Sequence, residues 1–290
     1  MKKLPVLVGL LLCAASSTNA YQGLSSPYGS SYDSGESAYS KSSSYDNAPN
    51  RVWEIAPEIY HATYKEQDIM KNKGMMVGIG GAYTYDRETW LLKGELRGAW
   101  GSVDYSSPSS GTASGFGDTM FEARGTMGFK QETKKNHIIT FFGVAYRYLN
   151  DDSSGKTTST GARGYERESN YFYSPIGIEF TRHLKDRWTW GGSIEYDLFW
   201  TGRQVSHLSD AVSSLGNVSN DQDSGYGFRF SLKFKRQGDK FDVLIEPFFR
   251  WWHVDYSGLS NVTYQGVLVG YGYEPENTTS ELGAKIALLY

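Results

Sequence analysis

The sequence has little cysteine, little proline and no long apolar segment beyond its first twenty residues. Its single cysteine, Cys13, lies in an N-terminal segment that we expect to be removed, so disulfides and thiol catalysis are excluded for the mature chain. Outside that segment no apolar run reaches the roughly 18 residues that a transmembrane helix needs. The formal net charge of -3 is too mild to indicate a nucleic-acid partner.

Two N-terminal segments differ in composition from the rest. Residues 1–20 begin with Lys2 and Lys3, continue with a short apolar run and end on small residues at Ala20, which is the pattern of a secretory signal peptide. Residues 21–50 are rich in Ser, Tyr and Gly and have no apolar periodicity. Such a segment buries too little surface to offset its ordering entropy, so we expect it to be disordered in the periplasm.

Aromatic residues and glycine are abundant, with 22 Tyr, 14 Phe, 8 Trp and 33 Gly against 8 Pro. The mean hydropathy of -0.49 resembles that of a soluble protein, but membrane strands that alternate between lipid and lumen also average out as polar. From residue 51 onward apolar and polar positions alternate with the period of a β-strand. The alternating segments are residues 52–64, 75–86, 90–100, 119–130, 137–149, 170–181, 187–202, 226–235, 240–256 and 281–290.

The last segment, Glu281 to Tyr290, shows the strictest alternation. Its apolar positions share one parity, and Lys285 lies on the other. We expect this to be the closing strand of a barrel, with its apolar parity toward lipid and Lys285 turned inward toward an acid such as Glu58. The apolar positions are Leu282, Ala284, Ile286, Leu288 and Tyr290.

The connections alternate in length. Short polar ones occur at residues 86–89, 131–136, 183–186 and 237–239, and long ones at 65–74, 106–118, 150–169, 203–225 and 257–279. Tight periplasmic turns and long outer loops are typical of outer-membrane barrels. The sequence therefore predicts an all-β fold, a ten-stranded antiparallel up-and-down transmembrane β-barrel over residues 51–290, with a bulge or local break at Pro247. A soluble barrel or sandwich is the alternative, but charged positions opposite tryptophan-rich faces argue against it.

The parity that we assign to the lumen carries charges of both signs. Ten strands enclose little more than the width needed for side chains, and unpaired charges in so narrow a space are costly. We therefore predict an interior plugged by ion pairs. The central residues of this network are Lys93, Glu95, Arg97, Glu122, Arg124, Arg147, Glu195, Asp197 and Arg229.

With an export signal, an even number of alternating strands and a last strand that ends on an aromatic residue, the chain resembles bacterial outer-membrane β-barrel proteins. By this resemblance, Leu282, Ile286, Leu288 and Tyr290 form the signal read by the barrel-assembly machinery. Outer-membrane lipid, lipopolysaccharide and that machinery are the expected partners. Ten strands with large outer loops is also the architecture of the omptin proteases.

The omptin resemblance implies an Asp-x-Asp pair and an Asp-x-His pair that face each other across the barrel mouth. The first is missing, and His207 precedes Asp210 in the wrong order and spacing. His253 and Asp255 form a His-x-Asp pair, and residues two apart on a strand share a face, so both can point into the mouth. They are weak catalytic candidates, because polar residues on a solvated strand end explain them as well.

No cofactor or metal site is expected, since loop acids such as Asp151 and Asp221 are typical of solvated loops. The leading hypothesis is a non-enzymatic barrel of the cell outer membrane that acts through its surface loops, because function usually resides in loops on a rigid scaffold. A small porin-like channel and an omptin-like protease are the alternatives.

Overall fold

The computed structural model describes residues 50–133 and 136–290. The predicted signal peptide and nearly all of the Ser/Tyr-rich segment lie outside the described residues. Among the described residues no helix is long and apolar enough to cross a membrane.

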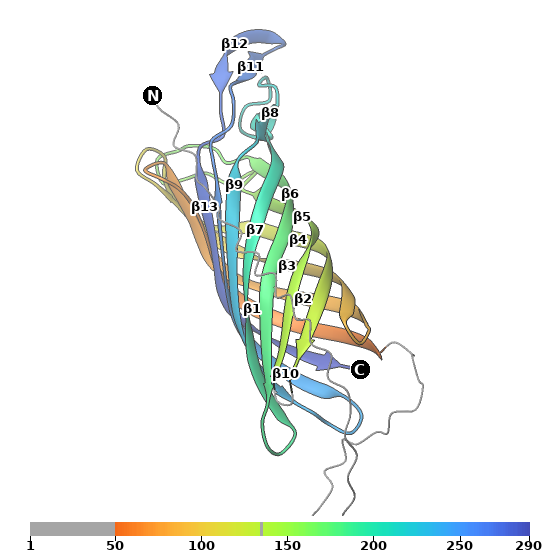
Figure 1. Cartoon of the computed structure of the whole chain (residues 1–290). Coiled ribbons are helices and arrows are strands. Elements are labelled where there is room, and N and C mark those ends of the chain that lie inside the picture. Colours follow the sequence, from red (N-terminus) through yellow and green to blue (C-terminus); the bar gives the residue numbers. More distant parts are fainter. Residues whose placement is uncertain (1–49, 134–135) are drawn as a thin grey trace, which may run out of the picture. The chain divides into compact units, whose positions relative to one another are not determined.

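The described chain folds into a closed, ten-stranded antiparallel β-barrel (Figure 1). The barrel strands are β1 (Asn50–Glu66), β2 (Met70–Asp86), β3 (Trp90–Ser107), β4 (Gly111–Glu132), β5 (Asn136–Asp152), β6 (Glu166–His183), β7 (Trp188–Ser206), β9 (Gly225–Arg236), β10 (Asp242–Val254) and β13 (Asn277–Leu289). Consecutive strands pair from β1 to β7, β7 pairs with β9, and β9 pairs with β10. β13 pairs with both β10 and β1 and completes the ring. The predicted fold class is therefore confirmed.

The outer end of the barrel carries additional structure. A short helix, α1 (Leu208–Ala211), and the strand β8 (Val218–Gln222) lie between β7 and β9, and β8 pairs with the outer end of β7. A separate hairpin of β11 (Ser260–Tyr264) and β12 (Val267–Gly272) lies between β10 and β13. These elements gather at one end of the barrel, opposite the C-terminus (Figure 1).

The strands run further outward than the sequence pattern predicts. The expected long loops at 65–74 and 106–118 are mostly strand, so that only residues 67–69 and 108–110 connect the paired strands. Apolar residues alternate with polar ones only where one face of a strand contacts lipid. Two strands can pair without that pattern, because the pairing needs only backbone hydrogen bonds. Beyond the lipid the ladder continues while the alternation stops, and the expectation of loops there was wrong.

Pro247 lies within β10 without a bulge. On the β13 side it pairs with Ala284 in continuous register. On the β9 side the register is the same before and after it, with Ile245 opposite Phe234 and Phe248 opposite Ser231. The lost amide donor therefore removes ladder pairs locally without shifting the strand.

The outward face forms a continuous apolar band. On β13, Leu282 and Ile286 are exposed, as is Tyr290 directly after it, as predicted. Comparable side chains project from every other barrel strand. Tyr290 also exchanges backbone hydrogen bonds with Trp53 of β1, at 3.0 and 2.9 Å. Exposure of so many large apolar side chains is stable only against lipid. The tryptophans of this face include Trp53, Trp100, Trp188, Trp190 and Trp200.

Candidate functional site

The lumen is crossed by a network of buried charges, which we call the lumen network; its centre is Arg229. This guanidinium donates to Asp197 at 2.7 Å and to Glu122 at 2.6 and 3.0 Å, and lies 3.2 Å from Glu195. The Tyr173 hydroxyl donates to Glu122 at 2.8 Å. Each acid has an opposite charge or a donor within reach, which is the condition for keeping it buried.

Glu281 is the second centre of the lumen network. Its carboxylate, with 2% of the side chain exposed, accepts hydrogen bonds from Arg147 at 2.6 Å, Arg250 at 3.0 Å and Arg97 at 3.1 Å. Arg97 and Arg250 also donate to Glu58, at 3.0 and 3.2 Å. Because Arg97 lies 3.4 Å from Glu122, the two centres are connected across the barrel.

The nine residues predicted for the lumen all lie on the inward face and all take part in ion pairs. Arg124 lies 2.6 Å from Glu195 and 3.7 Å from Glu95, and Glu95 lies 2.8 Å from Lys93. These contacts form the layer nearer the short turns. The network residues of the prediction are Lys93, Glu95, Arg97, Glu122, Arg124, Arg147, Glu195, Asp197 and Arg229.

Lys285 points inward, but its partner differs from the prediction. Glu58 is directly opposite it in the ladder, yet Lys285 lies 2.8 Å from Glu54 and 3.2 Å from Glu246. Two arginines already neutralise Glu58. The long lysine side chain instead reaches along its own layer to acids on both neighbouring strands.

Aromatic rings fill the space around the charges. Tyr173 and Trp252 are fully buried and meet edge to face, with ring centroids 4.8 Å apart. The Arg147 and Arg229 guanidinium groups lie 5.5 and 5.7 Å from the Trp252 ring, within the range of cation–π attraction. Gly227 makes room for this ring, since a Cβ there would lie 2.9 Å from it.

Strand parity places Glu281 with Lys285 and Tyr173 with Glu179, because residues an even number of positions apart on a strand share a face. The sequence nevertheless did not identify these two residues as members of the network, and it did not single out Trp252. Trp252 follows the outward Trp251, so that only strict parity distinguishes the two. Nothing local indicates that Tyr173 would reach Glu122, which lies 51 positions away in sequence.

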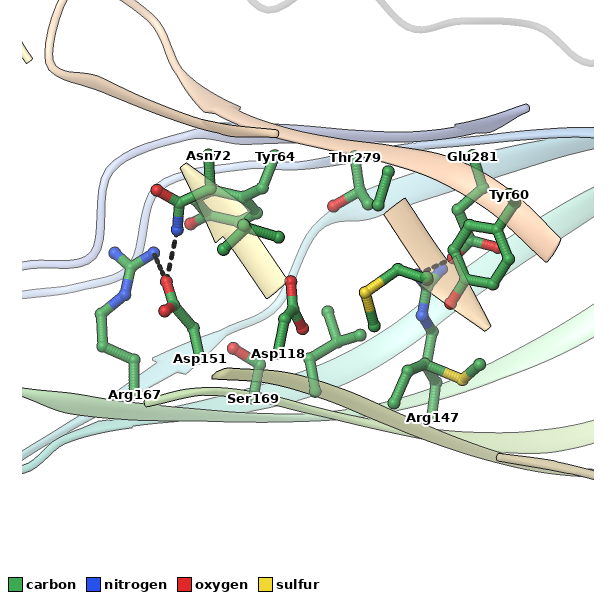
Figure 2. A pocket seen from close by; sticks show the side chains of 15 residues that line it. Tyr60, Tyr64, Asn72, Asp118, Arg147, Asp151, Arg167, Ser169, Thr279 and Glu281 are labelled. Atoms are coloured by element: carbon green, nitrogen blue, oxygen red, sulfur yellow. Dashed lines mark hydrogen bonds and ion pairs between the residues drawn. The ribbon is translucent and has the colours of Figure 1, made fainter. Parts of the chain in front are cut away.

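A cavity of about 50 Å³ lies on the outer side of the lumen network (Figure 2). Asp118 and Asp151 are opposite each other on β4 and β5, and both line it together with Asn72, Arg167 and Ser169. The Asn72 amide donates to Asp151, while Arg167 pairs with Glu66 and lies 3.8 Å from both Asp151 and Glu274. We call this group of residues the outer chamber. A second space, of about 370 Å³, lies toward the short turns.

Acids outnumber bases in the outer chamber, beyond the apolar band. Burial, with the nearby Asp151 carboxylate, raises the pKa of Asp118 to about 7. Burial also raises the pKa of Glu274, to about 7, against the attraction of Arg167. Burial raises the pKa of Asp151 as well. Arg167 is the one cation that contacts these acids in the described chain, so near neutral pH part of the group holds protons.

The histidine candidates do not meet in the mouth. His253 Nε2 lies 2.9 Å from Asp255, but the ring stacks on Trp251 and against Tyr226 on the outward face. The inward residues of this strand are its neighbours Trp252 and Val254, so the expectation that His253 points inward was wrong. His207 contacts Glu168 and Asn217 near α1. No group of three metal-ligating side chains is present in residues 50–133 and 136–290.

A closed barrel with an apolar outer band and a charged interior is the architecture of an outer-membrane protein, and solved structures agree. The outer-membrane protease OmpT of Escherichia coli superposes with a TM-score of 0.60 at 10% identity, covering 86% of this chain and 99% of that one. This likeness establishes the fold. The protein is therefore a ten-stranded β-barrel of the outer membrane.

Two further solved structures superpose less well. The NalP translocator domain of Neisseria meningitidis has a TM-score of 0.40 at 12% identity, covering 81% of this chain and 87% of that one. The Ralstonia pickettii toluene transporter TbuX has a TM-score of 0.36 at 10% identity, covering 82% and 88%. No family model matches the sequence, and no curated protein matches it.

Proposed function

We propose that this protein is a non-enzymatic outer-membrane barrel whose lumen is closed and whose role is exercised at the cell surface. The supporting observation for closure is the lumen network, in which Arg229, Glu122, Glu281 and Arg97 bridge opposite walls. A conducting pore needs mobile water along its axis, and interlocked buried ion pairs leave little room for it.

Closure predicts a simple transport result. Liposomes that carry the wild-type barrel should not swell in isotonic arabinose, whereas a porin of known size should produce rapid swelling in parallel. Swelling at a comparable rate would favour the porin-like alternative.

The surface role rests on the hairpin of β11 and β12. Residues 256–273 contain no charged side chain, yet Leu259, Val267, Val269 and Tyr271 are each more than half exposed. A β11 residue, Tyr264, bridges to Leu215 on one side, whereas β12 pairs only with β11 among the described strands. An uncharged, apolar strand with a free edge suits a partner that adds an extended segment by backbone hydrogen bonding.

If the hairpin is a docking site, charges introduced into it should abolish adhesion. Cells that display wild-type protein should bind to one another or to a host surface more than cells without it. Val267→Lys with Val269→Lys should abolish the difference, because two buried ammonium groups would oppose docking. Thr157→Lys with Thr160→Lys, in the loop between β5 and β6, is the matched control. Equal adhesion by all three would remove the hairpin from the proposal.

An omptin-like hydrolase is the second candidate, favoured by the opposed carboxyls of Asp118 and Asp151. Two opposed carboxyls that share one proton can donate and accept protons in turn. Cleavage of a mixed peptide library by wild type, and its loss in Asp118→Asn and Asp151→Asn, would establish this reading. Absence of cleavage by wild type supports the non-enzymatic proposal.

A further inference from the structure

Two histidines meet at the short-turn end of the barrel, far along the strands from the outer chamber. His137 is near the start of β5 and His183 ends β6. Their Nε2 atoms lie 2.8 Å apart, and the rings meet edge to face with centroids separated by 4.8 Å. Both have the parity of Phe141 and Glu179, which line the inner space, so the pair lies on the inward rim.

A carboxylate fixes one of the rings. Glu132 at the end of β4 lies 3.2 Å from His137 Nδ1, where Nδ1–H can donate to it. Glu132 is itself 3.4 Å from Lys130, which lies 2.9 Å from Asp86. A proton held on Nδ1 makes Nε2 of His137 an acceptor, so that Nε2–H of His183 donates to it. An ion that takes the place of this shared proton would meet both Nε2 nitrogens. The same carboxylate–histidine arrangement orients metal-ligating histidines in many proteins.

The separation of the two nitrogens also matches one kind of metal geometry. With metal–nitrogen bonds of about 2.0 Å, two imidazoles at a right angle place their nitrogens about 2.8 Å apart, whereas tetrahedral angles need about 3.3 Å. Right-angled nitrogen ligands are typical of tetragonal copper(II) and nickel(II), and copper(II) binds such sites more tightly.

We propose that His137 and His183 form a binding site for one copper(II)-class ion at the inner rim of the barrel, with Glu132 as a positioning residue. The described residues supply no third side-chain ligand of the usual kind, so water completes the coordination and the site is an open one.

The test uses the full-length mature protein without an affinity tag, purified in detergent and checked for heat-modifiable gel mobility. Copper(II) chloride is titrated in by calorimetry, and electron paramagnetic resonance spectra are recorded. We expect one ion per chain with tetragonal parameters and two coupled nitrogens. His137→Ala and His183→Ala should each remove one coupled nitrogen and weaken binding at least about tenfold.

Glu132→Gln separates positioning from ligation. It should keep two coupled nitrogens but weaken binding by about tenfold, the usual effect of losing such a partner. His253→Ala is the matched control and should bind as wild type does. Binding by the His137→Ala/His183→Ala double variant with wild-type affinity and spectrum would overturn the site, and so would a wild type that binds no copper(II) at millimolar concentration.

Discussion

At the scale of single residues, Glu281 is one of the two centres of the lumen network. Three arginines converge on its carboxylate, and Arg147 has only 2% of its side chain exposed. A buried ion pair adds little net stability by itself, because desolvation offsets the attraction. Removing one member has a much larger effect, since the remaining charges stay buried without compensation.

Glu281→Gln should therefore destabilise the barrel by about 3–5 kcal/mol, measured as the free energy of urea unfolding in detergent micelles. The control is Asp239→Asn, which removes the partner of Arg187 at a mostly exposed site and should cost at most about 1 kcal/mol. Similar effects for the two variants would show that the network is not tightly coupled.

Residue-level predictability was uneven. Strand parity assigns Lys285 to the lumen. Its pairing with Glu54 and Glu246 could not be predicted, because it depends on which acids already pair with arginines. Glu58 was the nearest candidate by register, and it is held by Arg97 and Arg250. The prediction that His253 points inward was wrong. Neighbouring residues on a strand point to opposite faces, and in β10 it is Trp252 that points inward.

At the scale of elements, the strand extensions form the outer chamber, which responds to pH. The folded-state pKa values of Asp118 and Glu274 are raised to about 7 from ordinary values of 3.8 and 4.5. A raised carboxyl pKa means that the folded state binds protons more tightly than the unfolded one. Its stabilising effect is full below about pH 4 and is lost as pH rises through about 7.

Asp118→Asn should accordingly flatten the pH dependence. The midpoint temperature of heat-modifiable mobility should fall between pH 5 and pH 8 by more in wild type than in the variant. An equal fall in both proteins would contradict the burial of an ionisable Asp118 in the chamber.

The last strand carries the other prediction at this scale. Deletion of Tyr290 removes two backbone hydrogen bonds to Trp53, a ring contact with Phe241 and the final aromatic of the proposed assembly signal. We expect less folded barrel in the outer membrane, measured as the heat-modifiable fraction. Deletion of the β11–β12 hairpin should leave that fraction near wild type, whereas normal assembly without Tyr290 would count against the signal.

The strands themselves were predictable where lipid imposes alternation, and for that reason all ten segments correspond to barrel strands. Their outer ends, β8, and the β11–β12 hairpin were not predictable. On these parts lipid does not cover the outward face, and the buried inward face of the strand ends and of β8 carries polar side chains such as Asn72, Gln204 and Asn220. The sequence there therefore carries no apolar period. The outer chamber was missed with them, because its acids lie on extensions that were read as loops.

At the scale of the whole molecule, one parity of every barrel strand faces lipid and the other parity contributes to the lumen. The strands thus bring charges from distant parts of the chain together, as with Arg147 and Glu281, which are 134 positions apart. The lumen network and the aromatic rings around it occupy the middle of the barrel. We propose on this basis that the barrel is a scaffold for its outer surface.

Single-channel recording in a planar bilayer tests this claim most directly. Wild-type protein should give no discrete openings over a wide voltage range, because we propose that the ion pairs around Arg229 and Glu281 close the lumen. Removing both centres, with Arg229→Ala and Glu281→Ala in one folded variant, should produce openings. Regular, reproducible openings of the wild-type barrel would contradict the account.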